Sequence, residues 1–237
     1  QSMRVCLAIR AAINSKAAGF SGHAAGSRCW GNYIHDLQCT GAQETHGMYI
    51  DSPDKSSPDQ SLDIDIGWNW VGSAPGGNAC QLNDNLGSSD GSGTWRGFKG
   101  IAIHHNFFEN YAKYGLNFGP GTVQAKAWNN VFNGGALGCG RVDSTATGID
   151  LQVDFNTIYN VDQVVSGPGH GQLISTASSG GAGTIKVRGN IMVAGPKTVA
   201  GSQIYATTGG TPATWQPDGN LYYGPAQSTV WSSAHFA

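Results

Sequence analysis

The chain has 237 residues, enough for one domain with a sizeable core, and hydrophobic residues make up 39% of it, which excludes an intrinsically disordered composition. Charged residues make up only 12%, and the formal net charge of −2 argues against nucleic acid or an anionic membrane surface as a partner. No apolar run approaches the roughly 18–20 residues that a membrane-spanning helix needs. Glycine is abundant, at 36 residues, so the composition is poor for helices and indicates an all-β protein.

Residues 1–27 do not carry the repeat that organises the rest of the chain. Val5 and Ile9 share a helical face and Ser2 is a candidate N-cap, which predicts a short helix that caps one end of the fold. The same apolar residues also fit a strand, so that alternative stays open. Residues 17–27 are small and glycine-rich and are expected to form a loop.

From residue 28 onward the chain repeats one short pattern, seen most clearly in Ile101-Ala102-Ile103-His104-His105-Asn106-Phe107-Phe108. Apolar residues precede an Asn by five and three positions, and bulky residues follow it. The Asn residues of the seven copies are Asn32, Asn69, Asn106, Asn130, Asn156, Asn190 and Asn220. A register this constant, with spacings that vary between 24 and 37 residues, predicts one repeated structural unit with loops of different length.

Each copy is predicted to contain an alternating strand, a bend at the Asn and a short second strand. These units are expected at residues 28–37, 62–71, 99–108, 123–132, 149–158, 184–193 and 215–223. A third short strand is predicted after most copies, at residues 46–51, 79–82, 114–118, 136–139, 170–175 and 203–205. The Asn amide can bond backbone groups at the bend, and Asn tolerates the left-handed conformation. Stacked coils then predict an asparagine ladder.

A bend Asn followed by bulky residues, about once per coil, resembles the right-handed parallel β-helix of the pectate-lyase-like superfamily. The resemblance covers residues 28–224 and implies a single all-β solenoid of about seven coils. Residues 1–27 would then be an N-terminal cap or loop, and residues 225–237 a C-terminal tail. The superfamily includes polysaccharide lyases, glycoside hydrolases, phage tailspikes and adhesive surface proteins, so the resemblance implies a fold without fixing a function.

Residues two and four positions before each Asn are predicted to point outward and to form two stripes on one sheet face. The inner stripe is Trp30, Gly67, His104, Trp128, Asp154, Arg188 and Asp218. The outer stripe is Arg28, Asp65, Ala102, Lys126, Gln152, Lys186 and Gln216. Aromatic rings beside charges suit sugar stacking and hydrogen bonding, so Trp30, His104, Trp128 and Lys126 are candidate substrate-binding residues. The alternative is a solvated sheet face of mixed polarity.

Catalytic candidates lie on the same face. A lyase needs a base next to a uronate carboxylate and a cation to neutralise that carboxylate, which makes Asp154, Arg188 and Lys186 candidates. The alternative for Asp154 and Arg188 is a cross-strand ion pair. Alternation places His104 outward and His105 inward, so these neighbours are not expected to act as a chelating pair.

An acidic loop contains Asp51, Asp54 and Asp59, which are candidate Ca²⁺ ligands because calcium prefers carboxylate oxygens. The loop lacks the spacing of a calcium-binding loop, and solvated carboxylates are the alternative.

The five cysteines follow no metal-binding spacing. Cys80 and Cys139 fall at inward positions and are predicted to be buried thiols. A disulfide among Cys6, Cys29 and Cys39 is a further hypothesis.

The leading functional hypothesis is an extracellular β-helix that binds a polysaccharide across the exposed sheet face. Whether it also cleaves the polysaccharide, as a lyase or a glycoside hydrolase, stays open. The alternative is a structural subunit without enzymatic activity whose copies stack end to end, because the ends of a β-helix present open strand edges. Abundant Gly, Asn, Ser and Thr with few Lys and Glu residues predict a secreted or cell-surface location.

Overall fold

The computed structural model describes residues 20–22, 26–35, 37, 45–51, 61–72, 74–83, 99–119, 121–135, 138–142, 148–161, 172–176, 183–194, 205–207 and 214–223. The regular elements within these ranges are β-strands, and the same ranges contain no helix long and apolar enough to cross a membrane. The predicted N-terminal capping helix and the C-terminal tail lie outside the described residues.

The strands form three parallel sheets of seven strands each within the described part of the chain. The first sheet contains β2 (Arg28–Trp30), β5 (Ser61–Gly67), β8 (Lys99–His104), β11 (Gln124–Trp128), β14 (Ile149–Asp154), β17 (Gly183–Arg188) and β20 (Thr214–Asp218). The second contains β3 (Tyr33–Ile34), β6 (Trp70–Val71), β9 (Phe107–Tyr111), β12 (Val131–Gly135), β15 (Thr157–Val161), β18 (Ile191–Ala194) and β21 (Leu221–Tyr223). The third contains β1 (Phe20–Gly22), β4 (Met48–Asp51), β7 (Cys80–Asn83), β10 (Tyr114–Phe118), β13 (Gly138–Val142), β16 (Gln172–Thr176) and β19 (Tyr205–Thr207).

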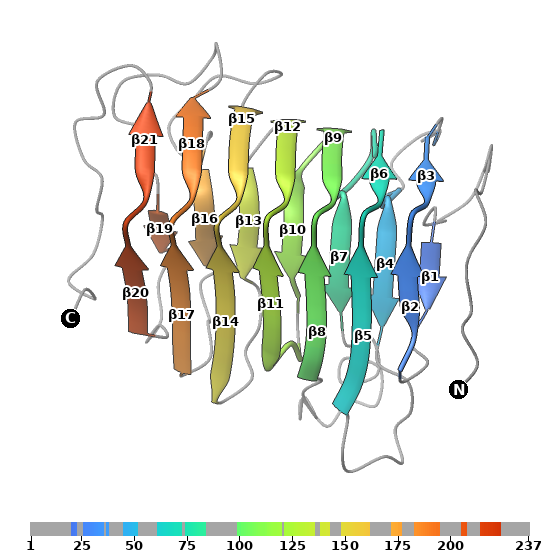
Figure 1. The fold of residues 1–237 in the computed structure, drawn as a ribbon, viewed down its shortest axis with the longest axis horizontal. Coiled ribbons are helices and arrows are strands. Elements are labelled where there is room, and N and C mark those ends of the chain that lie inside the picture. The colour runs from blue at the N-terminus through green and yellow to red at the C-terminus, as the bar shows by residue number, and fades with distance from the viewer. Residues whose placement is uncertain are drawn as a thin grey trace.

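The chain winds through the three sheets as a solenoid. Figure 1 shows it rising through a strand of the first sheet, bending into the second, and returning behind through the third before it begins the next strand, one position further along. This winding is right-handed, the usual sense for parallel strands joined by crossovers. The predicted all-β parallel solenoid is confirmed, with three sheets as its walls.

The strand pattern starts earlier than the sequence predicts. Residues 20–22 fall in the segment that was expected to be a loop, yet they form β1. This strand pairs in parallel with β4, with Phe20 opposite Met48. Its three residues are too few for an alternating pattern to be recognised, so pairing with β4 defines the strand.

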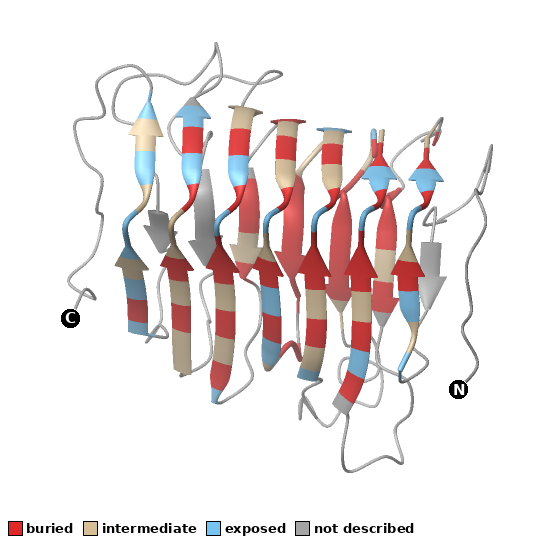
Figure 2. Cartoon of the chain, in the orientation of Figure 1, coloured by how far each residue is buried: buried red, intermediate tan, exposed pale blue. Residues whose placement is uncertain are grey.

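The core follows the predicted register. Residues five and three positions before each ladder Asn are buried in β5, β8, β11, β14 and β17, while the residue between them is more exposed (Figure 2). In β20, Trp215 is buried and Pro217 is partly exposed. Stacking these apolar rows through successive coils gives one continuous core, which a single coil could not bury alone.

The seven repeat Asn residues form the predicted ladder between the first and second sheets. Each Asn from Asn32 to Asn190 donates its Nδ2 to the Oδ1 of the next, over 2.8–3.0 Å. From Asn69 onward, each Nδ2 also donates to a backbone carbonyl of the preceding coil, over 2.7–3.2 Å. Each Oδ1 also accepts a hydrogen bond from a backbone N–H. In the middle of the ladder, both the Nδ2 and the Oδ1 of every buried amide therefore have partners.

The left-handed residue at each bend is the one before the Asn, and not the Asn as predicted. These residues have φ between +52° and +67°: Gly31, Trp68, His105, Asn129, Phe155, Gly189 and Gly219. The positive φ breaks the strand alternation, so His105 is exposed and the prediction that it points inward is wrong. Gly and Asn adopt this conformation readily, whereas a bulky residue there costs about 1–2 kcal/mol.

Cys29, Cys80 and Cys139 are buried thiols, as predicted for the last two. The hypothesis of a disulfide from Cys29 is therefore wrong, because this thiol lies inside the core beside Asn32. Cys6 and Cys39 lie outside the described residues.

We expect Cys80 to resist alkylation in the folded protein. Burial, and secondarily the nearby Cys29, raise the pKa of the Cys80 thiol from 9.0 to about 12, so the reactive thiolate does not form near pH 8. In the unfolded chain this thiol has its ordinary pKa of 9.0. The free energy of unfolding should therefore decrease as the pH rises from about 9 to 12. Iodoacetamide labelling followed by peptide mass spectrometry, with and without denaturant, tests this; rapid labelling of native Cys80 would contradict it.

Candidate functional site

An aromatic cluster covers the first sheet and the bend beside it. Trp68 stacks on His105 with ring centroids 5.1 Å apart and meets His104 edge-on at 4.7 Å. Trp128 stacks on His104 at 4.6 Å, and Trp30 meets Trp68 edge-on at 5.2 Å. We call these five residues the aromatic cluster. Trp30 lies in β2, His104 in β8 and Trp128 in β11, and the other two lie at the bends after β5 and β8, so stacking of four successive coils brings them together.

The first-sheet strands pair in the register that the predicted stripes require. Trp30 pairs with Gly67, Gly67 with His104, and His104 with Trp128. Trp30, His104 and Trp128 therefore lie in one row of the first sheet, with Gly67 between Trp30 and His104, and Lys126 lies over the Trp128 ring. His104 is nevertheless only 7% exposed, because it packs between Trp68 and Trp128. Gly67 makes room for the ring, since a Cβ at that position would lie 2.6 Å from His104 Cε1.

The two histidines contact each other, although strand alternation predicted opposite directions for them. His104 Nδ1 lies 3.0 Å from His105 Nδ1, because the left-handed bend turns His105 to the outer side. His104 Nε2 lies 2.7 Å from Asp65 Oδ1, on the neighbouring strand. At the far end of the pair, His105 Nε2 lies 3.3 Å from Asn129 Nδ2. Asp65, His104 and His105 thus form one hydrogen-bonded chain from the sheet to the surface.

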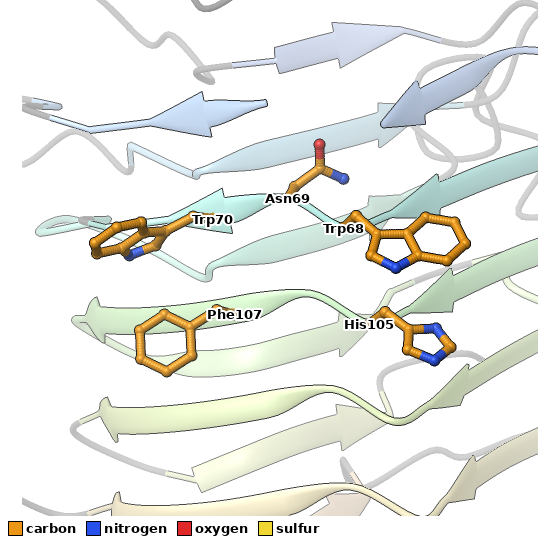
Figure 3. A pocket seen from close by; sticks show the side chains of 5 residues that line it. All are labelled: Trp68, Asn69, Trp70, His105 and Phe107. Atoms are coloured by element: carbon orange, nitrogen blue, oxygen red, sulfur yellow. The ribbon is translucent and has the colours of Figure 1, made fainter. Parts of the chain in front are cut away.

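A shallow hollow of about 420 Å³ adjoins the cluster. Figure 3 shows Trp68 and His105 on one side of Asn69, with Trp70 and Phe107 on the other. Trp68 is 54% exposed and Trp70 44%, and the Trp70 indole N–H donates to Glu109 Oε1 over 2.7 Å. Sequence reasoning missed these four rings. The position before each ladder Asn was the available signal for Trp68 and His105, since other copies have Gly or Asn there.

Two cations lie on the rings of the cluster. Arg28 Cζ is 5.2 Å from the Trp30 ring centre, and Lys126 Nζ is 5.2 Å from that of Trp128. Neither cation pairs with a carboxylate in the part of the chain that the structure describes. They give this face a positive charge that is available to an anionic ligand.

No protein-family model, curated protein or solved structure matches this chain. The likeness to the pectate-lyase-like superfamily therefore rests on the repeat and the solenoid alone. What the face can bind has to follow from its own residues.

The three catalytic candidates lie beside the cluster, and each of them is part of an ion pair. Arg188 Nε and Nη2 donate to the two carboxylate oxygens of the buried Asp154 over 3.1 and 2.6 Å. Lys186 Nζ donates to Asp150 Oδ1 over 3.1 Å. The hydrogen bond to Asp154 raises the pKa of Arg188 above its usual value, so Arg188 stays protonated and is poorly suited to accept a proton. The arrangement corresponds to the ion-pair alternative.

Of the three candidate Ca²⁺ ligands, one lies in the described part of the chain. Asp51 ends β4, whereas Asp54 and Asp59 lie outside the described residues. Across the described ranges, no three His, Cys, Asp or Glu side chains are grouped to hold a metal ion. The calcium site stays a prediction.

Proposed function

We propose that this protein binds a polysaccharide across the aromatic cluster and the adjoining hollow. Sugar rings present apolar C–H faces that pack on flat aromatic side chains, with hydroxyl groups at the edge for hydrogen bonding. The cluster offers rings in several orientations on one continuous face. The charged or amide side chains of Arg28, Lys126 and Asn129 border these rings and can contact polar groups of a bound chain.

The exposed, strained conformation of Trp68 is the observation that carries this proposal. Trp68 has φ +53°, which an L-residue with a bulky side chain adopts at a cost of about 1–2 kcal/mol. Three of the equivalent bend positions, Gly31, Gly189 and Gly219, avoid this cost, whereas His105 and Phe155 share it. A large ring held in such a conformation and 54% exposed contributes little to the core, and strain of this kind is concentrated at functional sites.

Arg28 and Lys126 favour an acidic polysaccharide over a neutral one, because their charges lie on the same rings that would stack with the sugar. The proposal includes a secreted or cell-surface location, where such polymers occur, and a distant relation to the pectate-lyase-like β-helices. Cleavage of the bound polysaccharide, by a lyase or a hydrolase reaction, would extend this binding function.

Retention in affinity gels tests the proposal. The wild-type chain is expected to migrate more slowly in gels that contain polygalacturonate or alginate than in plain gels, and to be unaffected by dextran at the same concentration. Unchanged migration in all acidic polysaccharides would contradict it.

A second candidate is a structural subunit that stacks end to end. Asn32 Oδ1, at the first rung of the ladder, is buried and accepts no hydrogen bond within the described part of the chain. Asn220, at the last described rung, has no further ladder Asn to donate to. Side chains of Ile191, Leu221 and Tyr223 are also exposed near this end of the second sheet. An acceptor at one end and donors at the other suit a head-to-tail contact.

Sedimentation velocity at increasing concentration tests this second candidate. End-to-end stacking predicts species that grow with concentration, and a Leu221→Lys substitution should shift them toward the monomer. A monomer at all concentrations would contradict it.

A further inference from the structure

The outer face of the second sheet carries a continuous apolar row. Its members are the residues that directly follow each ladder Asn, and the strand register sets them side by side. In chain order the apolar row is Tyr33, Trp70, Phe107, Val131, Thr157, Ile191 and Leu221. Six of the seven have an aromatic or aliphatic side chain, and none is charged. Figure 2 shows exposed residues on β3, β6, β18 and β21, at both ends of the row.

This face holds most of the exposed large hydrophobic side chains. Eight such side chains are exposed in the described part of the chain, and six of them lie on the second sheet: Tyr33, Trp70, Ile191, Val193, Leu221 and Tyr223. Contiguous apolar patches of several hundred Å² mark interaction sites. An end-to-end contact would not cover this one, because the row continues through Phe107 and Val131 along the side of the solenoid (Figure 1).

The face is large enough for a specific contact. A neighbouring row of side chains, two positions further along each strand, lies beside the apolar row. Seven strands about 4.8 Å apart make the face about 34 Å long, and its two rows make it about 14 Å wide. Two such faces packed together bury roughly 1,000 Å² in total, which is the lower limit for a biological interface. A reversible association is therefore expected.

The apolar row tapers from one end to the other. Its first three members are aromatic, and its last three are the smaller Thr157, Ile191 and Leu221, with Val131 in the middle. Two copies packed with the same ends together would meet ring against ring at one end and would leave a wedge-shaped gap at the other. Two copies that run in opposite directions place each ring opposite a smaller side chain. The distance between the two sheets then stays even along the row.

A two-fold axis through the coil of Val131, parallel to the strands, produces this antiparallel arrangement. The first coil of one copy then faces the last coil of the other, so that all seven coils are in contact. Tyr33 lies opposite Leu221, and Trp70 lies opposite Ile191. Each of these contacts occurs twice, once on either side of the axis.

The neighbouring row fits the same arrangement. Its one carboxylate is Glu109, which accepts hydrogen bonds from Trp70 Nε1 and Asn133 Nδ2. In the antiparallel pair, Glu109 faces Tyr159 of the second copy, and a tyrosine hydroxyl can donate to a carboxylate. Like charges therefore do not face each other across these two rows, which favours a specific contact.

We propose that two copies of this chain pack side by side, in opposite directions, through the apolar rows of their second sheets. Each copy presents the same surface, so the contact closes on itself and stops at a dimer. The aromatic cluster stays outside the contact, on the first sheet and its bends. Ile191 and Thr157 of the second copy border the hollow, beside Trp70 and Phe107. The dimer itself does not depend on saccharide binding.

Sedimentation velocity of wild type and charged variants tests the contact. Wild type should form a dimer, and no larger species, as its concentration rises. Tyr33→Lys and Leu221→Glu each put two unpaired charges into the dimer contact, so each should weaken dimerisation by about 100-fold or more. Phe155→Lys is the matched control, because Phe155 is exposed at a bend outside the second sheet. It should dimerise as wild type does.

The Tyr33→Lys/Leu221→Glu double variant tests the direction of packing. Only in the antiparallel dimer does Lys at position 33 face Glu at position 221. The double variant should therefore dimerise at least about tenfold more tightly than either single variant. Circular dichroism melting of each variant shows whether its fold is kept.

Small-angle X-ray scattering of the wild-type dimer gives a measurement that needs no variant. Copies that lie side by side keep the longest dimension close to that of the monomer, whereas copies joined end to end nearly double it. A wild-type monomer at all concentrations would overturn the proposal, as would single variants that dimerise like wild type. A double variant no tighter than the single variants would overturn the antiparallel contact. Species that grow beyond the dimer would overturn it in favour of end-to-end stacking.

Discussion

Replacing Asn130 with Ala is expected to lower the free energy of unfolding by about 3–5 kcal/mol. Asn130 is 1% exposed and stands in the middle of the ladder. Its amide donates to Asn156 Oδ1 and to the Ile103 carbonyl, and its Oδ1 accepts both the side chain and the backbone N–H of Asn106. Alanine removes all four bonds and leaves buried donors of Asn106 without an acceptor, which costs more than the bonds themselves contribute.

Urea unfolding, followed by circular dichroism and tryptophan fluorescence, measures this effect. Asn133→Ala is the matched control, because Asn133 is also an Asn after a bend but its amide bonds lie on the outer face, to Glu109 and Asn160. The control should lose less than about 1 kcal/mol. Equal losses for the two variants would show that the ladder contributes no more than surface amides do.

Trp68→Gly is expected to weaken polysaccharide binding by about 2 kcal/mol, or roughly 30-fold, without loss of the fold. The substitution removes the ring that stacks on His105 and forms one wall of the hollow. Glycine adopts the left-handed conformation at no steric cost, so relief of strain offsets the lost ring contacts, and stability should change by less than about 1 kcal/mol. Affinity electrophoresis and urea unfolding of the same preparation measure both quantities.

Phe155→Gly is the matched control for Trp68→Gly. Phe155 occupies the same bend position with φ +55° and is 62% exposed, but it does not line the hollow. It should match Trp68→Gly in stability and keep wild-type affinity. A similar loss of binding in both variants would mean that bend conformation, and not the Trp68 ring, determines affinity.

The repeat was sufficient to predict the architecture, because its chemistry is local and its register is constant. Each Asn needs partners one coil above and below, and each apolar pair needs neighbours of the same kind. These requirements determine the pairing of first-sheet strands, so that Trp30, His104 and Trp128 could be placed on one face from sequence alone. Strand β1 could not be found in this way, because its three residues carry no copy of the pattern.

The site was only partly predictable, because alternation fails where φ changes sign. The period of two applies up to His104, and the left-handed bend then turns His105 outward instead of inward. That single backbone change creates both the histidine pair and the stacking of Trp68 on His105. The Gly and Asn residues at the equivalent bend positions were the sequence signal for a positive φ there. The sequence predicted an ion pair of Asp154 and Arg188 as an alternative to a catalytic role. The distances between these side chains were needed to choose between the two interpretations.

Indole N–H resonances in a two-dimensional NMR titration test the central claim most directly. Addition of an oligogalacturonate or an oligomannuronate should shift the resonances of Trp68 and Trp128, which lie on the proposed binding face. The Trp215 resonance should stay in place, because that ring is buried in the last coil of the core. Saturable shifts confined to the cluster are the predicted result. Shifts that leave Trp68 and Trp128 unchanged, or no shifts at millimolar ligand, would contradict a saccharide-binding function for this face.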